Sequence, residues 1–324
     1  MKQSKSFMGR AAGPGLIFLL ALFLIALPYL SSEFWVIFGT YVLIMIVGAM
    51  SLNLLLGYGG MISFGHAAYF GVGAYACALL IKKAALPLPI CIVLGPVIAA
   101  GVAFIAGYFV VRLTHAYFAF LTLAFAMIIY TIASTWYSFT GGDNGVVGLP
   151  VGDFFSSTTN YYFFVLAISA VCMVALKVIV DSPFGLTLRA IRENPQRLRF
   201  IGINVRRHQL ITFVIAGFFA GVAGTLYALL DRSVFPTCLY WTRSGELLLM
   251  ILLGGMYHFV GPAVGATVLV FLDKFISDYT EYWPFFLGMA FLAVVLFLRG
   301  GLVGFVEERL ESLRVRKTAD RLNE

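Results

Sequence analysis

Long, continuous apolar runs occupy most of this chain, and they constrain its fold more than any other feature. We predict ten segments of roughly the length, about 20 residues, that a helix needs to span a bilayer. Strands of a membrane β-barrel would instead alternate apolar and polar residues. The sequence therefore predicts an all-α polytopic membrane protein with a single transmembrane domain, residues 1–324. The predicted segments are Ala11–Leu30, Phe34–Leu56, Met61–Ile81, Leu88–Val111, Ala116–Tyr137, Tyr161–Val180, Gln209–Leu230, Gly245–Tyr257, Pro262–Ser277 and Trp283–Leu298.

Two of these segments are irregular. Met61–Ile81 is dense in glycine, and Gly245–Tyr257 is short and contains the pair Gly254-Gly255. We expect either to be broken or re-entrant. Interrupted segments often flank a transporter's pathway, because free backbone groups at membrane depth are tolerated only beside protein or water. The two best candidates for an interruption beside the pathway are Gly57–Gly60 and Gly254-Gly255.

The distribution of basic residues predicts the orientation. Lys2, Lys5 and Arg10 precede the first segment, which has no A-x-A-like cleavage site and is therefore interpreted as a retained span and not as a signal peptide. Ten crossings place both termini on one side, and 17 of the 22 Lys and Arg residues fall on that side. Such an excess marks the cytoplasm. The pair Lys82-Lys83 does not fit this distribution, because it falls on the opposite side.

A polar segment, Asp181–Arg207, interrupts the apolar pattern and holds six of the chain's fifteen arginines. We call it the basic segment. Asn194-Pro195 predicts a helix start, because Asn caps free amides and Pro suits the first helical position. Gly202 suits the residue just past a helix end, and Leu198 and Ile201 supply an apolar stripe. Two short helices with a bend at Asn194 are expected. Arginines that only enforce orientation, or that only contact anionic lipid headgroups, stay open as alternatives, although orientation does not require such caps.

Polar residues at membrane depth are candidates for the translocation pathway. Asn53, Ser63 and His66 fall within apolar runs, where such groups face the protein interior or a cavity. A buried structural hydrogen bond and a contact with a transported solute both remain open for each. No metal site is expected, since His66 has no partner at metal-ligand spacing. The four cysteines are dispersed and are interpreted as small apolar helix residues.

Closely spaced glycines indicate tight helix packing. Gly71–Ala76 fits the dinucleotide pattern G-x-G-x-x-A but lacks a preceding strand, so packing is the better interpretation. Gly217/Gly221 and Gly261/Gly265 have the G-x-x-x-G spacing of close helix contacts.

Several motifs together resemble one family. The basic segment is similar to the cytoplasmic coupling segment of ABC importer permeases, and Ser51–Leu80 resembles the signature of the branched-chain amino acid permeases, closest to their LivM-like branch. The resemblance covers nearly the whole chain in order, and it departs from the family pattern at Asn194–Phe200. The matching residues are Ser182–Gly185, Arg189–Glu193, Gly202–Val205, Ser51–Leu80, Leu121–Phe125, Thr140–Pro150, Leu253–Met256 and Gly261–Gly265.

The resemblance implies a multi-pass permease subunit in a bacterial inner membrane that translocates leucine, isoleucine and valine. It implies a related permease as heterodimer partner, two ABC ATPase subunits and a periplasmic substrate-binding protein, with lipid around the spans and no nucleic acid. The cytoplasmic parts would be the basic segment and the tail 299–324. The implied ATPase-coupling residues are Arg189, Arg192, Glu193, Asn194, Arg197 and Gly202. The candidate pathway residues are Asn53, Ser63, His66, Thr122, Gly254 and Gly255.

The chain is not expected to be an enzyme. It contains no G-x-x-x-x-G-K-[ST], so ATP would bind to partner subunits, and no catalytic residue or cofactor is expected in this chain. Similar permeases for urea, short amides or aromatic amino acids are an alternative. An ion-coupled secondary transporter is a remoter one, because it would need ionisable groups within the membrane. Glu246 and Asp273 come nearest to that requirement.

Overall fold

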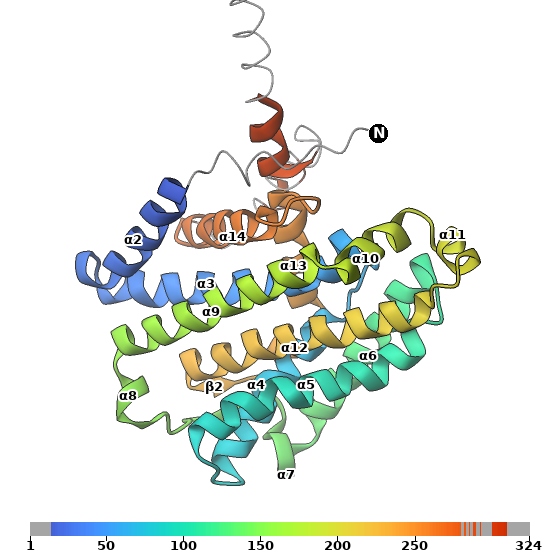
Figure 1. The fold of residues 1–324 in the computed structure, drawn as a ribbon. Helices are drawn as coiled ribbons and strands as arrows, with labels where there is room; N and C mark the ends of the chain where they lie inside the picture. The colour runs from blue at the N-terminus through green and yellow to red at the C-terminus, as the bar shows by residue number, and fades with distance from the viewer. Residues whose placement is uncertain are drawn as a thin grey trace, which may run out of the picture. The chain divides into compact units, whose positions relative to one another are not determined.

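Helices make up most of the residues that the computed structural model describes, which are 14–279, 282, 285, 288–289, 292 and 300–309. The all-α prediction is confirmed (Figure 1). The helices are α2 (Pro14–Leu30), α3 (Glu33–Asn53), α4 (His66–Lys82), α5 (Leu88–Val110), α6 (His115–Thr135), α7 (Tyr137–Thr140), α8 (Gly152–Ser156), α9 (Thr158–Asp181), α10 (Pro183–Glu193), α11 (Pro195–Phe200), α12 (Val205–Asp231), α13 (Trp241–Gly254) and α14 (Gly261–Ser277). A π-helical turn η1 (Leu54–Tyr58), 3-10 turns η2 (Gly142–Asn144) and η3 (Pro236–Leu239), and strands β1 (Val146–Val147) and β2 (Ser233–Val234) complete the elements.

The long helices coincide with the predicted apolar segments. Within the described residues, five helical stretches are both long and apolar enough to cross a membrane: Glu33–Tyr58, which joins α3 and η1, together with α5, Ala116–Thr135 of α6, α9 and α12. The predicted segment Trp283–Leu298 lies almost entirely outside the described residues, as do the N-terminal lysines and residues 310–324.

The two irregular segments are both interrupted. The prediction of a helix from Met61 is wrong at its start, because Met61–Gly65 is non-helical and α4 begins at His66. The chain turns there at Gly60, whose φ of 67° favours glycine. Helix α13 has 14 residues, which is about 21 Å of helix against a hydrocarbon core of about 30 Å. It ends at Gly254, and Gly255 has a φ of 111°.

By its internal contacts the chain divides into two units, residues 37–248 and the remainder. In the first, α4, α5 and α12 pack against one another and form the core. Glycines permit this: a Cβ on Gly221 would lie 2.5 Å from Ala99 Cβ of α5, and one on Gly73 would collide with the Gly221 backbone. The predicted tight packing of Gly217 and Gly221 is confirmed, since neither position has room for a methyl group. The single-domain prediction stays a prediction.

Gly224 of α12 provides a test of this packing. A Cβ there would overlap the carbonyl of Phe70 in α4, which is backbone and cannot rotate away. We expect Gly224→Ala to lower the free energy of unfolding by about 1–3 kcal/mol, measured by thermal unfolding of the purified protein in detergent. Gly101→Ala in α5 is the matched control, because a Cβ there meets nothing within 4 Å. Equal stability of the two variants would contradict the packing argument.

The loop between α6 and α9 is fastened to the core at several points. Val146 and Val147 of β1 pair antiparallel with Val234 and Ser233 of β2. Lys82 Nζ donates to the Val147 carbonyl at 2.6 Å, and Lys83 Nζ donates to the Ser138 carbonyl at 2.5 Å. Lys82 and Lys83, the basic pair that the sequence places on the side with few basic residues, therefore stabilise this loop.

The second unit contains α2, the first residues of α3, the end of α13, α14 and the helical residues 301–309. Trp35 stacks on Phe271 of α14, with ring centroids 6.2 Å apart. Gly261 and Gly265 lie so close to the end of α13 that added Cβ atoms would overlap its backbone. The predicted close packing at this second glycine pair is therefore also confirmed.

Candidate functional site: the basic segment and the interrupted helix

The basic segment folds as the caps predict. Ser182 Oγ accepts the Gly185 amide proton at the start of α10, and Asn194 Oδ1 accepts that of Arg197 at the start of α11. Asn204 caps α12 in the same way, through the Arg207 amide. Each of these oxygens satisfies an amide that the first turn of a helix leaves free. The predicted bend at Asn194-Pro195 is confirmed.

Gly202 ends α11 as predicted. Its φ is 86°, the Gly202 amide donates to the Arg199 carbonyl and the Ile203 amide donates to the Leu198 carbonyl. These two hydrogen bonds satisfy carbonyls at the end of α11. They require a left-handed backbone at Gly202, a conformation that glycine adopts most easily. The segment is therefore an ordered pair of short helices.

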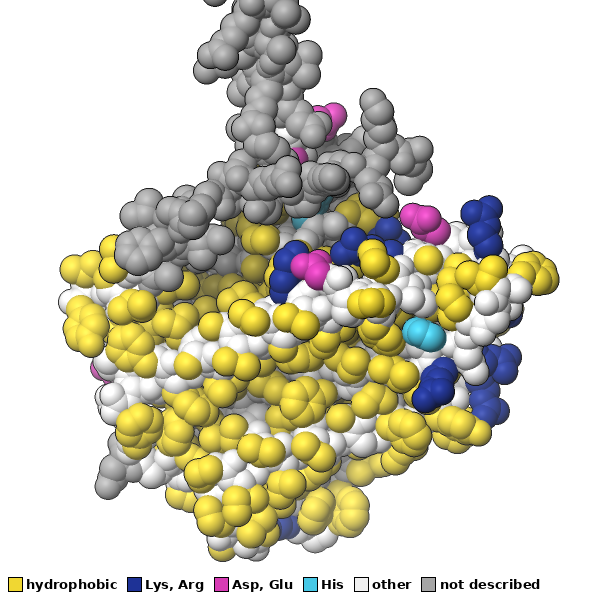
Figure 2. All heavy atoms as spheres, in the orientation of Figure 1, with side chains coloured by type: hydrophobic (Ala, Val, Ile, Leu, Met, Phe, Trp, Pro, Cys, Tyr) yellow, Lys and Arg dark blue, Asp and Glu magenta, His cyan; other side chains and the backbone are white. Residues whose placement is uncertain are grey.

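The two faces of the basic segment differ in chemistry. Leu188, Ile191 and Leu198 are buried. The expected apolar stripe at Ile201 is wrong: Ile201 is 69% exposed and Phe200 is 90% exposed. Helix α11 is too short and turns too early for its last residues to reach the core. In Figure 2 basic side chains gather around the end where α10 and α11 lie, whereas the face over α9, α12 and α5 is largely hydrophobic.

Two of the arginines contact the interrupted helix. Arg192 Nη1 donates a hydrogen bond to the carbonyl of Gly57 in η1. The Arg192 stem lies under the turn, since a Cβ on Gly60 would be 2.6 Å from Arg192 Cγ. The Arg189 guanidinium lies 5.1 Å from the centroid of the Tyr58 ring, a cation–π distance. The structure thus joins the basic segment to the break after α3.

The other predicted coupling residues remain at the surface. Glu193, Asn194, Arg197 and Gly202 are all exposed, with Asn194 and Gly202 shaping the backbone. Helical periodicity could not separate these residues from Arg189 and Arg192, because basic residues occupy several faces of two short helices.

The pathway candidate His66 is fully buried at the start of α4. Its Nε2 lies 2.8 Å from Ser51 Oγ, and the Ser51 hydroxyl in turn donates to the Gly48 carbonyl. His66 Nε2 is then the donor to Ser51. Ser244 of α13 accepts the Ala67 amide proton at 2.8 Å. Ser51 and Ser244 were not singled out from the sequence, where they are small polar residues beside or within apolar runs.

The remaining candidates of this unit surround the same break. Thr122 Oγ1 accepts the Phe64 amide proton at 3.2 Å and donates to the Ala119 carbonyl, so it fastens the non-helical stretch to α6. Asn53 Oδ1 and Ser63 Oγ are buried and have no hydrogen-bond partner among the described residues. Gly254 and Gly255 belong to the other unit, where both serve the tight turn after α13. Their roles in a pathway stay predictions.

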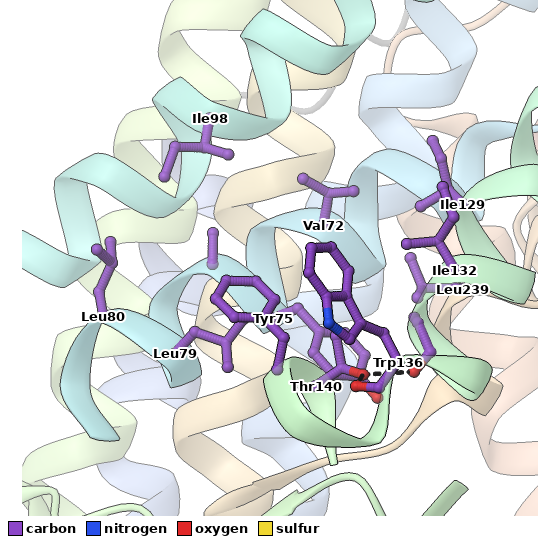
Figure 3. A pocket seen from close by; sticks show the side chains of 13 residues that line it. Val72, Tyr75, Leu79, Leu80, Ile98, Ile129, Ile132, Trp136, Thr140 and Leu239 are labelled. Carbon is purple, nitrogen blue, oxygen red and sulfur yellow. Dashed lines mark hydrogen bonds between the residues drawn. The ribbon is translucent and has the colours of Figure 1, made fainter. Parts of the chain in front are cut away.

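An apolar pocket of about 300 Å³ lies between α4, α5, α6, α7 and η3 (Figure 3). The Tyr75 hydroxyl has no hydrogen-bond partner among the described residues. Nothing in the lining carries a charge, so the pocket by itself does not recognise an ionic group. The lining residues that Figure 3 labels are Val72, Tyr75, Leu79, Leu80, Ile98, Ile129, Ile132, Trp136, Thr140 and Leu239.

Within the described part of the chain, no cluster of His, Cys, Asp and Glu has metal-binding geometry. All four cysteines are buried and free of disulfides.

The sequence profile of the family described as "branched-chain amino acid transport system / permease component" matches residues 35–298, which run from near the start of α3 to beyond the end of α14. The chain belongs to this family. The permease thus carries the capped basic segment and the interrupted helices within its family region.

Curated relatives agree over most of the permease. LivM of Escherichia coli, a high-affinity branched-chain amino acid transport system permease protein, is 28% identical over 91% of this chain and 76% of its own length. A probable branched-chain amino acid permease LivM of Methanocaldococcus jannaschii is 25% identical over 80% of this chain and 85% of its own length. The guanosine ABC transporter permease NupQ of Bacillus subtilis is 31% identical over 44% of each chain. No solved structure gives a significant match.

Proposed function

We propose that this chain is the membrane-spanning permease subunit of an ABC importer that translocates leucine, isoleucine and valine. Family membership supports the transport role, and the names of the LivM relatives support the substrate class. The observation that supports the mechanism is the contact of Arg192 with Gly57, because it connects the exposed basic segment to the end of a long apolar helix.

ATP hydrolysis would occur on two separate ATPase subunits that dock on the basic segment. Their closure would move α10 and α11. One residue separates α9 from α10, and four residues separate α11 from α12. The same motion would pull on η1 through Arg192 and Arg189. Because the backbone is already non-helical at Met61–Gly65, a change there costs fewer helical hydrogen bonds than a change within an intact span.

A related permease would complete the membrane domain as a heterodimer, and a periplasmic binding protein would deliver the substrate. The permease would lie in a bacterial inner membrane, and its termini and the basic segment would face the cytoplasm. The loop fastened by Lys82 and Lys83 would then face the binding protein.

Uptake of radiolabelled leucine tests the substrate class. Cells that lack this chain should lose most high-affinity leucine uptake, and restoring the chain should recover it. Excess unlabelled isoleucine and valine should compete in the restored cells, whereas urea, phenylalanine and guanosine should not. Undiminished leucine uptake without the chain, or competition by one of those three compounds alone, would contradict the proposal.

A further inference from the structure

An arginine and a glutamate lie together in the first two turns of α13, away from the basic segment. Arg243 Nη1 is 2.8 Å from Glu246 Oε2, and the two side chains are 18% and 39% exposed. Both belong to the unit of residues 37–248. They are part of or adjacent to a predicted transmembrane segment, where an ionisable pair that faced lipid would be costly. Such a pair therefore faces protein or a water-filled pathway.

Neighbouring aromatic residues hold the guanidinium in place. Arg243 Nη1 also donates to the Tyr41 hydroxyl of α3 at 2.9 Å. The Arg243 guanidinium lies 5.6 Å from the centroid of the Tyr227 ring in α12, and the Tyr227 ring in turn lies 5.5 Å from that of Phe70 in α4. Four helices therefore fix the position of this charge before any ligand arrives.

Much of the hydrogen-bonding capacity of the pair is unused. Among the described residues, Arg243 bonds only through Nη1, which leaves Nε and Nη2 as the adjacent edge that can bind a carboxylate through two parallel hydrogen bonds. Glu246 bonds only through Oε2, so Oε1 can accept from an ammonium group.

We propose that Arg243 and Glu246 bind the carboxylate and the ammonium group of the transported amino acid within the permease. A neutral ion pair matches a zwitterion, because each charge of the ligand meets its opposite and the net charge of the site stays unchanged. This proposal rests on the proposed function and adds a binding site to it. A site for the two charged groups common to all amino acids would leave the choice of side chain to other parts of the importer.

The test is an equilibrium measurement on the complete permease–ATPase complex without its binding protein. Equilibrium dialysis measures the affinity of wild type and of Glu246→Gln for two radiolabelled ligands. The ligands are leucine and 4-methylpentanoate, which lacks the ammonium group. Gln still accepts the hydrogen bond of Arg243 but carries no charge. Leucine should bind about 10- to 100-fold more weakly to Glu246→Gln than to wild type, the range expected for a charge-assisted hydrogen bond. The affinity for 4-methylpentanoate should be equal or higher in Glu246→Gln, because removing the carboxylate charge leaves Arg243 as a net positive charge for the ligand's carboxylate.

Asp278→Asn is the matched control, because Asp278 forms an exposed ion pair with Lys274 on α14. Its leucine affinity should equal that of wild type. Equal leucine binding by wild type and Glu246→Gln would overturn the proposal, as would equal losses for both ligands. Loss of the second permease from purified Glu246→Gln would identify the pair as a subunit contact and would also overturn it. Leucine uptake by the wild-type importer tests the proposed function separately.

Discussion

Arg192→Met should uncouple ATP hydrolysis from uptake. In proteoliposomes that contain the complete importer, we expect leucine uptake to fall about tenfold or more, while hydrolysis stimulated by the binding protein continues. The ratio of leucine transported to ATP hydrolysed is the quantity to measure.

The expectation follows from what methionine keeps and what it removes. Met retains an unbranched stem beneath Gly60, so packing under the turn changes little. It removes the donor to the Gly57 carbonyl, which is a charge-assisted hydrogen bond in a partly buried place. Docked ATPases could then still move α10, but η1 would no longer follow.

Arg199→Met is the matched control, since Arg199 lies on the same segment but is exposed. It removes the same charge and should leave the transport ratio near that of wild type. An unchanged ratio in Arg192→Met, with normal assembly, would rule out the Arg192 contact as the transmitting link.

Phe200→Asp should release the ATPase subunits. Phe200 is 90% exposed at the end of α11, followed by Ile201 at 69%, and Leu186 on α10 is 58% exposed. Exposed apolar side chains beside arginines are typical of a protein interface, and a central aromatic residue often contributes 2 kcal/mol or more to binding. We expect affinity for the ATPases to fall at least about thirtyfold, measured by co-purification and by titration in detergent.

The same substitution at Phe154 controls for surface charge. Phe154 is 62% exposed on α8. Helix α8 precedes α9 in the chain, and α10 follows α9. Phe154→Asp should retain the ATPases, because this residue lies at the opposite end of α9 from the basic segment. If the Phe200 variant kept its ATPases, the docking role of the basic segment would be wrong.

The positions of several helices and helix caps in this permease could be predicted accurately from its sequence. The helices at Leu88–Val111 and Tyr161–Val180, and the caps at Asn194 and Gly202, were all found where the sequence placed them. Apolar runs, caps and left-handed turns depend on residues within a few positions of one another, so their physics is contained in short stretches of chain. The start of α4 was misplaced because Met61–Gly65 is as apolar as a helix but bonds to Thr122 instead.

The contacts on which the proposed functions rest could not be predicted from the sequence. The sequence presented Arg192 as one of six similar arginines, and only the folded chain brings it to Gly57, 135 residues away. Arg243 and Tyr41 are separated by 202 residues, and the sequence alone assigned Arg243 to a loop. The sequence by itself determined the class of protein, its family and the two capped short helices of the basic segment. The tertiary structure decided which charges turn inward, because that depends on the packing of helices distant in the chain.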